Sequence, residues 1–106
     1  MKTGIIVYTA DAEAVWNAFR FGNFALAMGD QVKIFLLGKG VEIDSLDTNK
    51  FDVTEQVNTF LDTGGAIYAC GTCLEIHNLK AVEAYKVTTM KDMYEIIKES
   101  DKVVTF

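Results

Sequence analysis

The two cysteines of this chain lie within one tetrapeptide, Cys70-Gly71-Thr72-Cys73. A cysteine at a turn between a strand and a helix becomes a reactive thiolate when the helix N-terminus stabilises its negative charge. A second thiol three residues later lies one helical turn away, so it can form a disulfide with the first or accept a sulfur from it. The tetrapeptide therefore indicates sulfur chemistry, with Cys70 as the nucleophile and Cys73 as a resolving or accessory thiol. Two inert, buried cysteines are the alternative.

Three further residues are candidates for supporting that thiolate. The backbone N–H groups of Gly71 and Thr72 belong to the predicted helix N-terminus, and Gly71 has no side chain to block an approaching sulfur. Lys39 follows another predicted strand end, where its ammonium group could stabilise the thiolate. A solvated surface lysine is the alternative interpretation of Lys39.

Metal binding and thioredoxin-type catalysis fit the sequence less well. Cys70, Cys73 and His77 have a ligand-like spacing, but a closed zinc site needs a fourth ligand and normally a second, distant pair. Thioredoxin folds hold their substrate against a cis-proline, and this chain has no proline. We therefore expect neither a metal nor a cofactor, while dithiol redox chemistry on another fold stays open.

Length and composition limit the class of protein. The 106 residues suffice for one domain, residues 1–106, and half of them are apolar. A net charge of −5 argues against a nucleic-acid partner. No window approaches the roughly 20 apolar residues of a membrane helix, and no charged leader precedes the first predicted strand. Two cysteines are too few to stabilise a small secreted fold through disulfides. We expect a cytoplasmic protein without a membrane partner.

Strand-like and helix-like segments alternate along the chain, which predicts an α/β fold with a mainly parallel five-stranded sheet between helices, of flavodoxin-like appearance. The predicted strands are Gly4–Thr9, Gln31–Leu37, Ala66–Cys70, Val82–Val87 and Lys102–Phe106. The predicted helices are Ala12–Gly29, Val53–Thr63, Thr72–Leu79 and Met90–Glu99, with a loop over Val41–Lys50. Ligands bind at the carboxyl ends of parallel strands, so Cys70 is predicted at the functional edge.

The first predicted helix is apolar over an unusually wide arc. Beside its core-facing stripe, Phe21, Phe24 and Met28 extend the apolar surface sideways, beyond the ~100° stripe of an ordinary surface helix. We expect this second face to be buried between subunits of a homo-oligomer. Coverage by loops of the same chain is the alternative.

The sequence resembles that of the DsrE-like proteins, the family that includes DsrE, DsrF and TusD. The resemblance spans nearly the whole chain and is clearest over four segments: Ala25–Val41, Tyr68–Leu74, Thr88–Met93 and Asp101–Val104. It implies an α/β/α domain that assembles into trimers or hexamers. It also implies that Cys70 matches the cysteine that carries sulfane sulfur as a persulfide between a donor and an acceptor. Cys73 matches a C-G-x-C variant found in small stand-alone members.

Together these observations favour a cysteine-based sulfur carrier, or a sulfurtransferase-like protein, whose partners are sulfur donor and acceptor proteins or small sulfane-sulfur compounds. If Cys73 cleaves a persulfide on Cys70 and releases sulfide, the protein would act more like a reductase. A dithiol redox protein and a non-catalytic oligomeric module are the remaining hypotheses.

Overall fold

The computed structural model describes all residues from 1 to 106 as one α/β domain around a parallel sheet. The five strands lie in the order β4-β3-β2-β1-β5, and every neighbouring pair is parallel. Their bounds are β1 Lys2–Val7, β2 Gln31–Leu36, β3 Ala66–Cys70, β4 Lys86–Thr88 and β5 Lys102–Thr105. The helices are α1 Ala12–Ala27, the 3-10 segment η1 Gly38–Ser45, α2 Val53–Asp62, α3 Gly71–Ile76 and α4 Met90–Glu99. The predicted α/β class and five-stranded parallel sheet are therefore confirmed.

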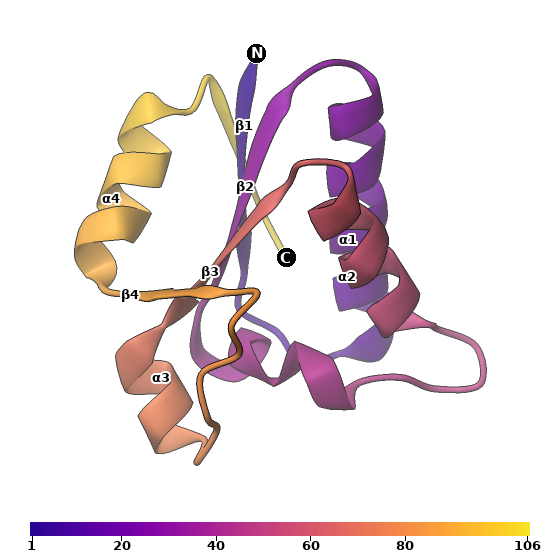
Figure 1. The fold of residues 1–106 in the computed structure, drawn as a ribbon, viewed down its shortest axis with the longest axis vertical. Helices are drawn as coiled ribbons and strands as arrows, with labels where there is room; N and C mark the ends of the chain where they lie inside the picture. The colour runs from indigo at the N-terminus through magenta and orange to yellow at the C-terminus, as the bar shows by residue number, and fades with distance from the viewer.

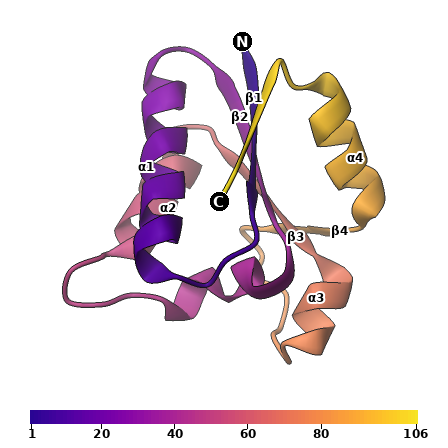
Figure 2. The same cartoon turned by 180° about the vertical axis from the view of Figure 1, so that it is seen from behind.

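Helices cover the two faces of the sheet unequally. Helices α1 and α2 lie together on one face, and α4 lies alone on the other (Figures 1 and 2). The main core fills the space between the sheet and α1/α2, where Phe19 and Phe60 meet edge to face. A smaller cluster of Phe35, Cys70 and Ile96 lies under α4. Helix α3 extends from the carboxyl edge of the sheet, beyond both layers (Figure 1).

Most differences from the predicted elements are shifts at their ends. The predicted loop is the exception, because η1 covers Gly38–Ser45 and buries Val41 and Ile43. The η1 segment consists of two short 3-10 pieces that meet at a kink at Glu42, and neither is long enough to give a periodic pattern in the sequence. The fourth strand is only Lys86–Thr88, so most of the predicted Val82–Val87 strand is loop. The first helix ends at Ala27, followed by Gly29 in the left-handed region at φ +92°.

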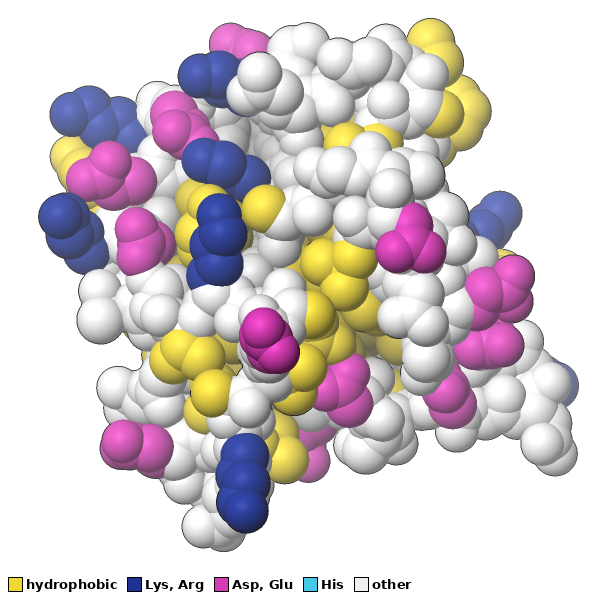
Figure 3. Space-filling view, viewed as in Figure 1, with side chains coloured by type: hydrophobic (Ala, Val, Ile, Leu, Met, Phe, Trp, Pro, Cys, Tyr) yellow, Lys and Arg dark blue, Asp and Glu magenta, His cyan; other side chains and the backbone are white.

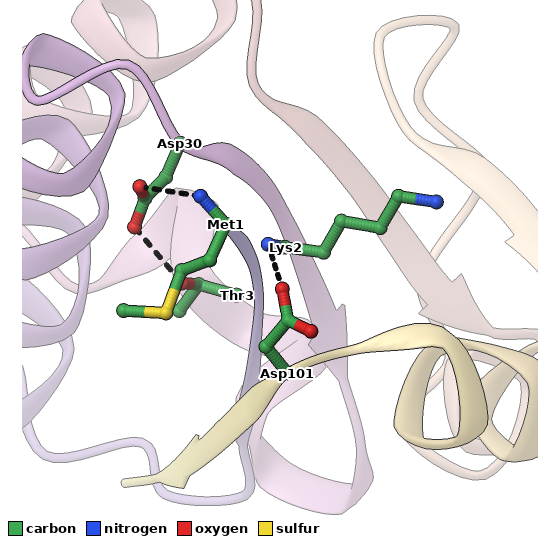
Figure 4. Close-up of polar contacts among 5 residues, drawn as sticks. All are labelled: Met1, Lys2, Thr3, Asp30 and Asp101. Atoms are coloured by element: carbon green, nitrogen blue, oxygen red, sulfur yellow. Dashed lines mark hydrogen bonds and ion pairs between the residues drawn. The ribbon is translucent and has the colours of Figure 1, made fainter.

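Polar contacts hold the start of β1 between its neighbours. The amino group of Met1 pairs with Asp30 at 3.1 Å, and the Thr3 hydroxyl donates to the same carboxylate at 3.2 Å (Figure 4). On the other side, the backbone N–H of Lys2 donates to Asp101 at 2.8 Å. These contacts explain why the first strand begins at Lys2, two residues before the predicted start.

Two helices keep apolar side chains on the surface. Phe24 and Met28 of α1 are 66% and 67% exposed, as expected for a face that the chain itself does not cover. Helix α4 buries only Ile96 and leaves Tyr94 exposed, although its sequence pattern predicts a broad apolar face. No helix combines the length and apolar character that a bilayer crossing requires.

Candidate functional site

Cys70 occupies the junction between the third strand and the short helix that follows it. It is the last residue of β3 and the N-cap of α3, with extended backbone angles. Its sulfur accepts a hydrogen bond from the backbone N–H of Cys73 at 3.4 Å. An N-cap side chain accepts from the second or third N–H of its helix, and Cys73 is that third residue. The predicted position at the carboxyl edge of the sheet is therefore what the structure shows, although the bonded N–H belongs to Cys73 and not to Gly71 or Thr72.

A second backbone N–H, from a distant part of the chain, donates a hydrogen bond to the side chain of Cys73. Its sulfur accepts a hydrogen bond from the N–H of Gly38 at 3.2 Å. Gly38 is the first residue of η1, so its N–H is one of those that have no partner within the 3-10 segment. The beginnings of two helical segments, η1 and α3, therefore meet at the two sulfurs.

The two thiols differ in their access to solvent. Cys70 is 4% exposed and packs with Phe35 and Ile96, beneath the partly buried side chains of Tyr68 and Met93. Cys73 is only partly buried, and both cysteines are free thiols. Cys73 is therefore the more solvent-accessible of the two thiols, whereas Cys70 is almost completely covered by its neighbours.

The environment of Cys73 keeps its thiol protonated. Partial burial raises the pKa of Cys73, and the adjacent Cys70 side chain raises it further, while the Gly38 N–H acts in the opposite direction. The net direction is upward from the ordinary value of 9.0. Because only a thiolate is a strong nucleophile, Cys73 is a weak nucleophile at neutral pH.

The open part of the sheet face beside Cys70 is positively charged. The ammonium groups of Lys33 and Lys86 lie 5.9 and 5.2 Å from the centre of the Tyr68 ring. Lys33 also pairs with Glu99, whereas Lys86 has no acidic partner within 4 Å. Figure 3 shows dark blue side chains beside an apolar one in this region, between α4 and the middle of the molecule. A cation without an acidic partner beside the strand that ends in Cys70 attracts an anionic reagent to this face.

The structure does not bring all the predicted residues to the sulfurs. Lys39 is exposed and makes no hydrogen bond or ion pair with either cysteine. Nδ1 of His77 faces Glu42 at 3.2 Å, and no three His, Cys, Asp or Glu side chains are grouped to hold a metal ion. The contact of Gly38 with Cys73 was not predicted, because the only signal for it in the sequence was a Gly-Lys-Gly segment after a predicted strand.

The comparisons with known proteins place the chain in a family. A sequence model of the DsrE/DsrF-like family matches residues 1–106. The chain belongs to the DsrE/DsrF-like family. Uncharacterized protein MJ0989 of Methanocaldococcus jannaschii is 35% identical over 114 residues, which cover the whole of both chains. Uncharacterized protein MK0008 of Methanopyrus kandleri is 33% identical over 100 residues, which cover 89% of this chain and 83% of that protein.

Solved structures share the fold of this DsrE/DsrF-like chain at low sequence identity. The ychN protein from E. coli has a TM-score of 0.84 at 15% identity, with both chains covered completely. BT1422 from Bacteroides thetaiotaomicron has a TM-score of 0.80 at 22% identity, covering 99% of this chain and 94% of that one. MTH1491 from Methanobacterium thermoautotrophicum has a TM-score of 0.77 at 11% identity, covering 97% of each chain. These similarities confirm the DsrE-like α/β fold that the sequence resemblance implied.

Proposed function

We propose that this DsrE/DsrF-like protein carries sulfane sulfur as a persulfide on Cys70. The observation that supports this most directly is the geometry of the strand end, where an N–H of α3 donates to the Cys70 sulfur at 3.4 Å. A thiol at a strand end, against the first turn of a helix, has the position expected of a reacting cysteine. A reducing cytoplasm keeps both thiols available, and the proposal places the protein there.

Loading and unloading need no redox partner. The Cys70 thiolate attacks the outer sulfur of the donor, and a new S–S bond forms as the donor's own bond to that sulfur breaks. With thiosulfate as donor, the bonding electron pair leaves on sulfite. An acceptor thiolate then attacks the terminal sulfur, and the electron pair of the broken bond returns to Cys70.

Cys73 provides a second route from the same intermediate. Its thiolate can attack the Cys70 sulfur of the persulfide, which forms a Cys70–Cys73 disulfide and expels hydrosulfide. A low-molecular-weight thiol is then required to reduce the disulfide. The raised pKa of Cys73 makes this route slow at neutral pH, so the geometry favours carriage over release.

Intact mass spectrometry after treatment with thiosulfate tests the proposal. The fully reduced protein should gain one sulfur atom, and alkylation followed by peptide mapping should place it on Cys70. Loss of the added mass on treatment with dithiothreitol identifies it as a persulfide. If thiosulfate and a polysulfide solution both leave the mass unchanged, the protein is not a sulfur carrier.

The protonation of Cys73 gives a pH-dependent prediction. In the folded protein, the midpoint of the pH dependence of Cys73 alkylation by iodoacetamide should lie above 9.0, because the folded environment raises the pKa of this thiol. In urea the midpoint should lie near the ordinary value of 9.0. Mass spectrometry of the Cys73 peptide between pH 7 and 11 measures both curves. A folded midpoint at or below 9.0 would contradict the assigned environment.

We further propose that the chain assembles into trimers or hexamers through the outer face of α1. Phe21 and Phe24 line an open hollow with Phe106, the residue after β5. Large exposed apolar patches on a folded surface mark sites of association. The proposal assigns this face to contacts between copies of the chain.

Replacement Phe24→Glu should shift the assembly toward monomers, because it places a charge in the apolar contact. Light scattering coupled to size exclusion measures the mass in solution. Tyr94→Glu on α4 is a matched control, since Tyr94 is 65% exposed and Phe24 is 66% exposed. A monomeric wild type, or equal disruption by both substitutions, would argue against this face.

A further inference from the structure

A pocket lies behind α3, on the face of the sheet opposite to Cys70. Successive side chains of a strand point to opposite faces, so Ala69 lines this pocket while Cys70 faces α4. The pocket has a volume of about 70 Å³ and is partly open to solvent. Its walls come from η1, β3, α3 and the segment that leads to β4. Figure 3 shows apolar side chains at this end of the molecule, with acidic side chains beside them.

The walls of the pocket are mostly apolar. Val41 and Leu74 are buried at its base, whereas Leu79, Val82 and Val87 are 39%, 41% and 49% exposed. The fold therefore leaves three aliphatic side chains without cover around one cavity. Small-molecule sites typically have such an apolar lining with few polar groups, and this pocket has that lining on a smaller scale.

Two carboxylates give the rim of the pocket its charge. Asp44 accepts a hydrogen bond from the Tyr85 hydroxyl through Oδ1 at 2.6 Å, and Glu42 pairs with His77 through Oε2 at 3.2 Å. The second oxygen of each carboxylate has no partner in the protein. Lys80 is the only cation in the lining, so the charged side chains that line the pocket sum to −1.

Tyr85 is held in its neutral form at this site. Burial raises the pKa of Tyr85, and its hydrogen bond to Asp44 raises it further. The hydroxyl therefore stays a donor, and it fixes the orientation of the Asp44 carboxylate. The Tyr85–Asp44 hydrogen bond attaches the segment that leads to β4, which forms the outer wall of the pocket, to η1. Residues 80–84 of this segment make only one backbone hydrogen bond, which the Val82 carbonyl accepts from the Tyr85 N–H.

We propose that this pocket binds a small apolar amine, with its hydrocarbon part against Leu74, Leu79 and Val82 and its ammonium group at the free oxygen of Asp44. The apolar walls select the hydrocarbon part, and the two carboxylates select the positive charge. The inference is independent of the proposed function, because neither cysteine lines the pocket.

Three fragments of similar shape test the pocket: benzylamine, benzyl alcohol and benzoate. In a ¹H–¹⁵N titration of the wild-type protein, benzylamine should shift the amide signals of Leu74, Leu79 and Tyr85. Benzyl alcohol should bind more weakly by about threefold or more, as expected for loss of one exposed ion pair. Benzoate should produce no shifts there. Equal binding of the amine and the alcohol, or shifts confined to another surface, would overturn the assignment.

Two substitutions locate the charge and the cavity. Asp44→Asn should abolish the preference for the amine while its carbonyl still accepts from Tyr85, whereas Asp62→Asn, at the exposed end of α2, should keep the preference. Val82→Trp places a large side chain over the pocket and should abolish binding of both benzylamine and benzyl alcohol. If the Val82→Trp protein still binds benzylamine, or if Asp44→Asn keeps the preference, the ligand lies elsewhere.

Discussion

Replacement Cys70→Ser should abolish the gain of sulfur from thiosulfate completely, and Cys73→Ser should leave that gain intact. The reason is chemical, because a serine hydroxyl cannot form a persulfide. Intact mass spectrometry of the reduced wild type and both variants, after the same exposure to donor, measures the result. The expected difference between the variants is all or none, the largest functional effect predicted for this chain.

The fold should tolerate both substitutions. Cys70 is the N-cap of α3, and serine is among the preferred N-cap residues, so its hydroxyl can accept from the Cys73 N–H. At position 73 a serine oxygen can likewise accept from the Gly38 N–H. Urea unfolding followed by circular dichroism serves as the control. A folded Cys70→Ser protein that still gains sulfur on Cys73 would reverse the assigned roles of the two thiols.

Replacement Gly40→Ala should destabilise the protein by about 3 kcal/mol or fail to give a folded product. A β-carbon at this position would lie 2.1 Å from the carbonyl oxygen of Val7 and 2.8 Å from its carbonyl carbon. These are backbone atoms of the buried residue Val7 at the carboxyl end of β1, and the same oxygen accepts from the Leu37 N–H at 2.9 Å. The protein could accommodate the added methyl group only if the backbones of β1 and η1 moved apart.

Gly71→Ala is the matched control for that substitution. A β-carbon at Gly71 would meet its nearest neighbours, Thr88 and Val87, at 3.4 Å, an ordinary contact distance. We expect a change within about 0.5 kcal/mol in the free energy of unfolding, measured by urea denaturation. Equal stability of the Gly40→Ala and wild-type proteins would show that η1 is not packed against β1 as described. A partly folded Gly40→Ala protein should also lose the Gly38 contact to Cys73.

Local sequence patterns were sufficient to predict the parallel sheet and the position of Cys70 at the end of its third strand. The predicted first strand overlaps β1, and the helix starts predicted at Ala12 and Val53 are found at those residues, where Asp11 and Asp52 each cap a backbone N–H. These signals depend on neighbours within one or two turns of the chain, which the sequence displays directly. The boundaries were less accurate because helix ends depend on contacts outside the helix.

The groups around the two sulfurs could not be predicted in the same way. The Gly38 N–H and the Cys73 sulfur are 35 residues apart, and Asp44 and Tyr85, which close the pocket behind α3, are 41 apart. No residue type or spacing in the sequence identifies such pairs. Lys39 was named as a candidate and Gly38 was not, because charge is visible in a sequence whereas the direction of a backbone N–H is not.

The sequence by itself determined an α/β chain of the DsrE-like type with two thiols at one strand end, because periodicity and a short motif are local properties. Only the tertiary structure decided that η1 donates an N–H to Cys73, that Gly40 must be glycine, and that a pocket with two carboxylates lies behind α3. These features lie where β1, β2 and β3 end side by side, and their geometry depends on all the packing contacts between those segments. The sequence pattern of one segment contains no information about its contacts with the others.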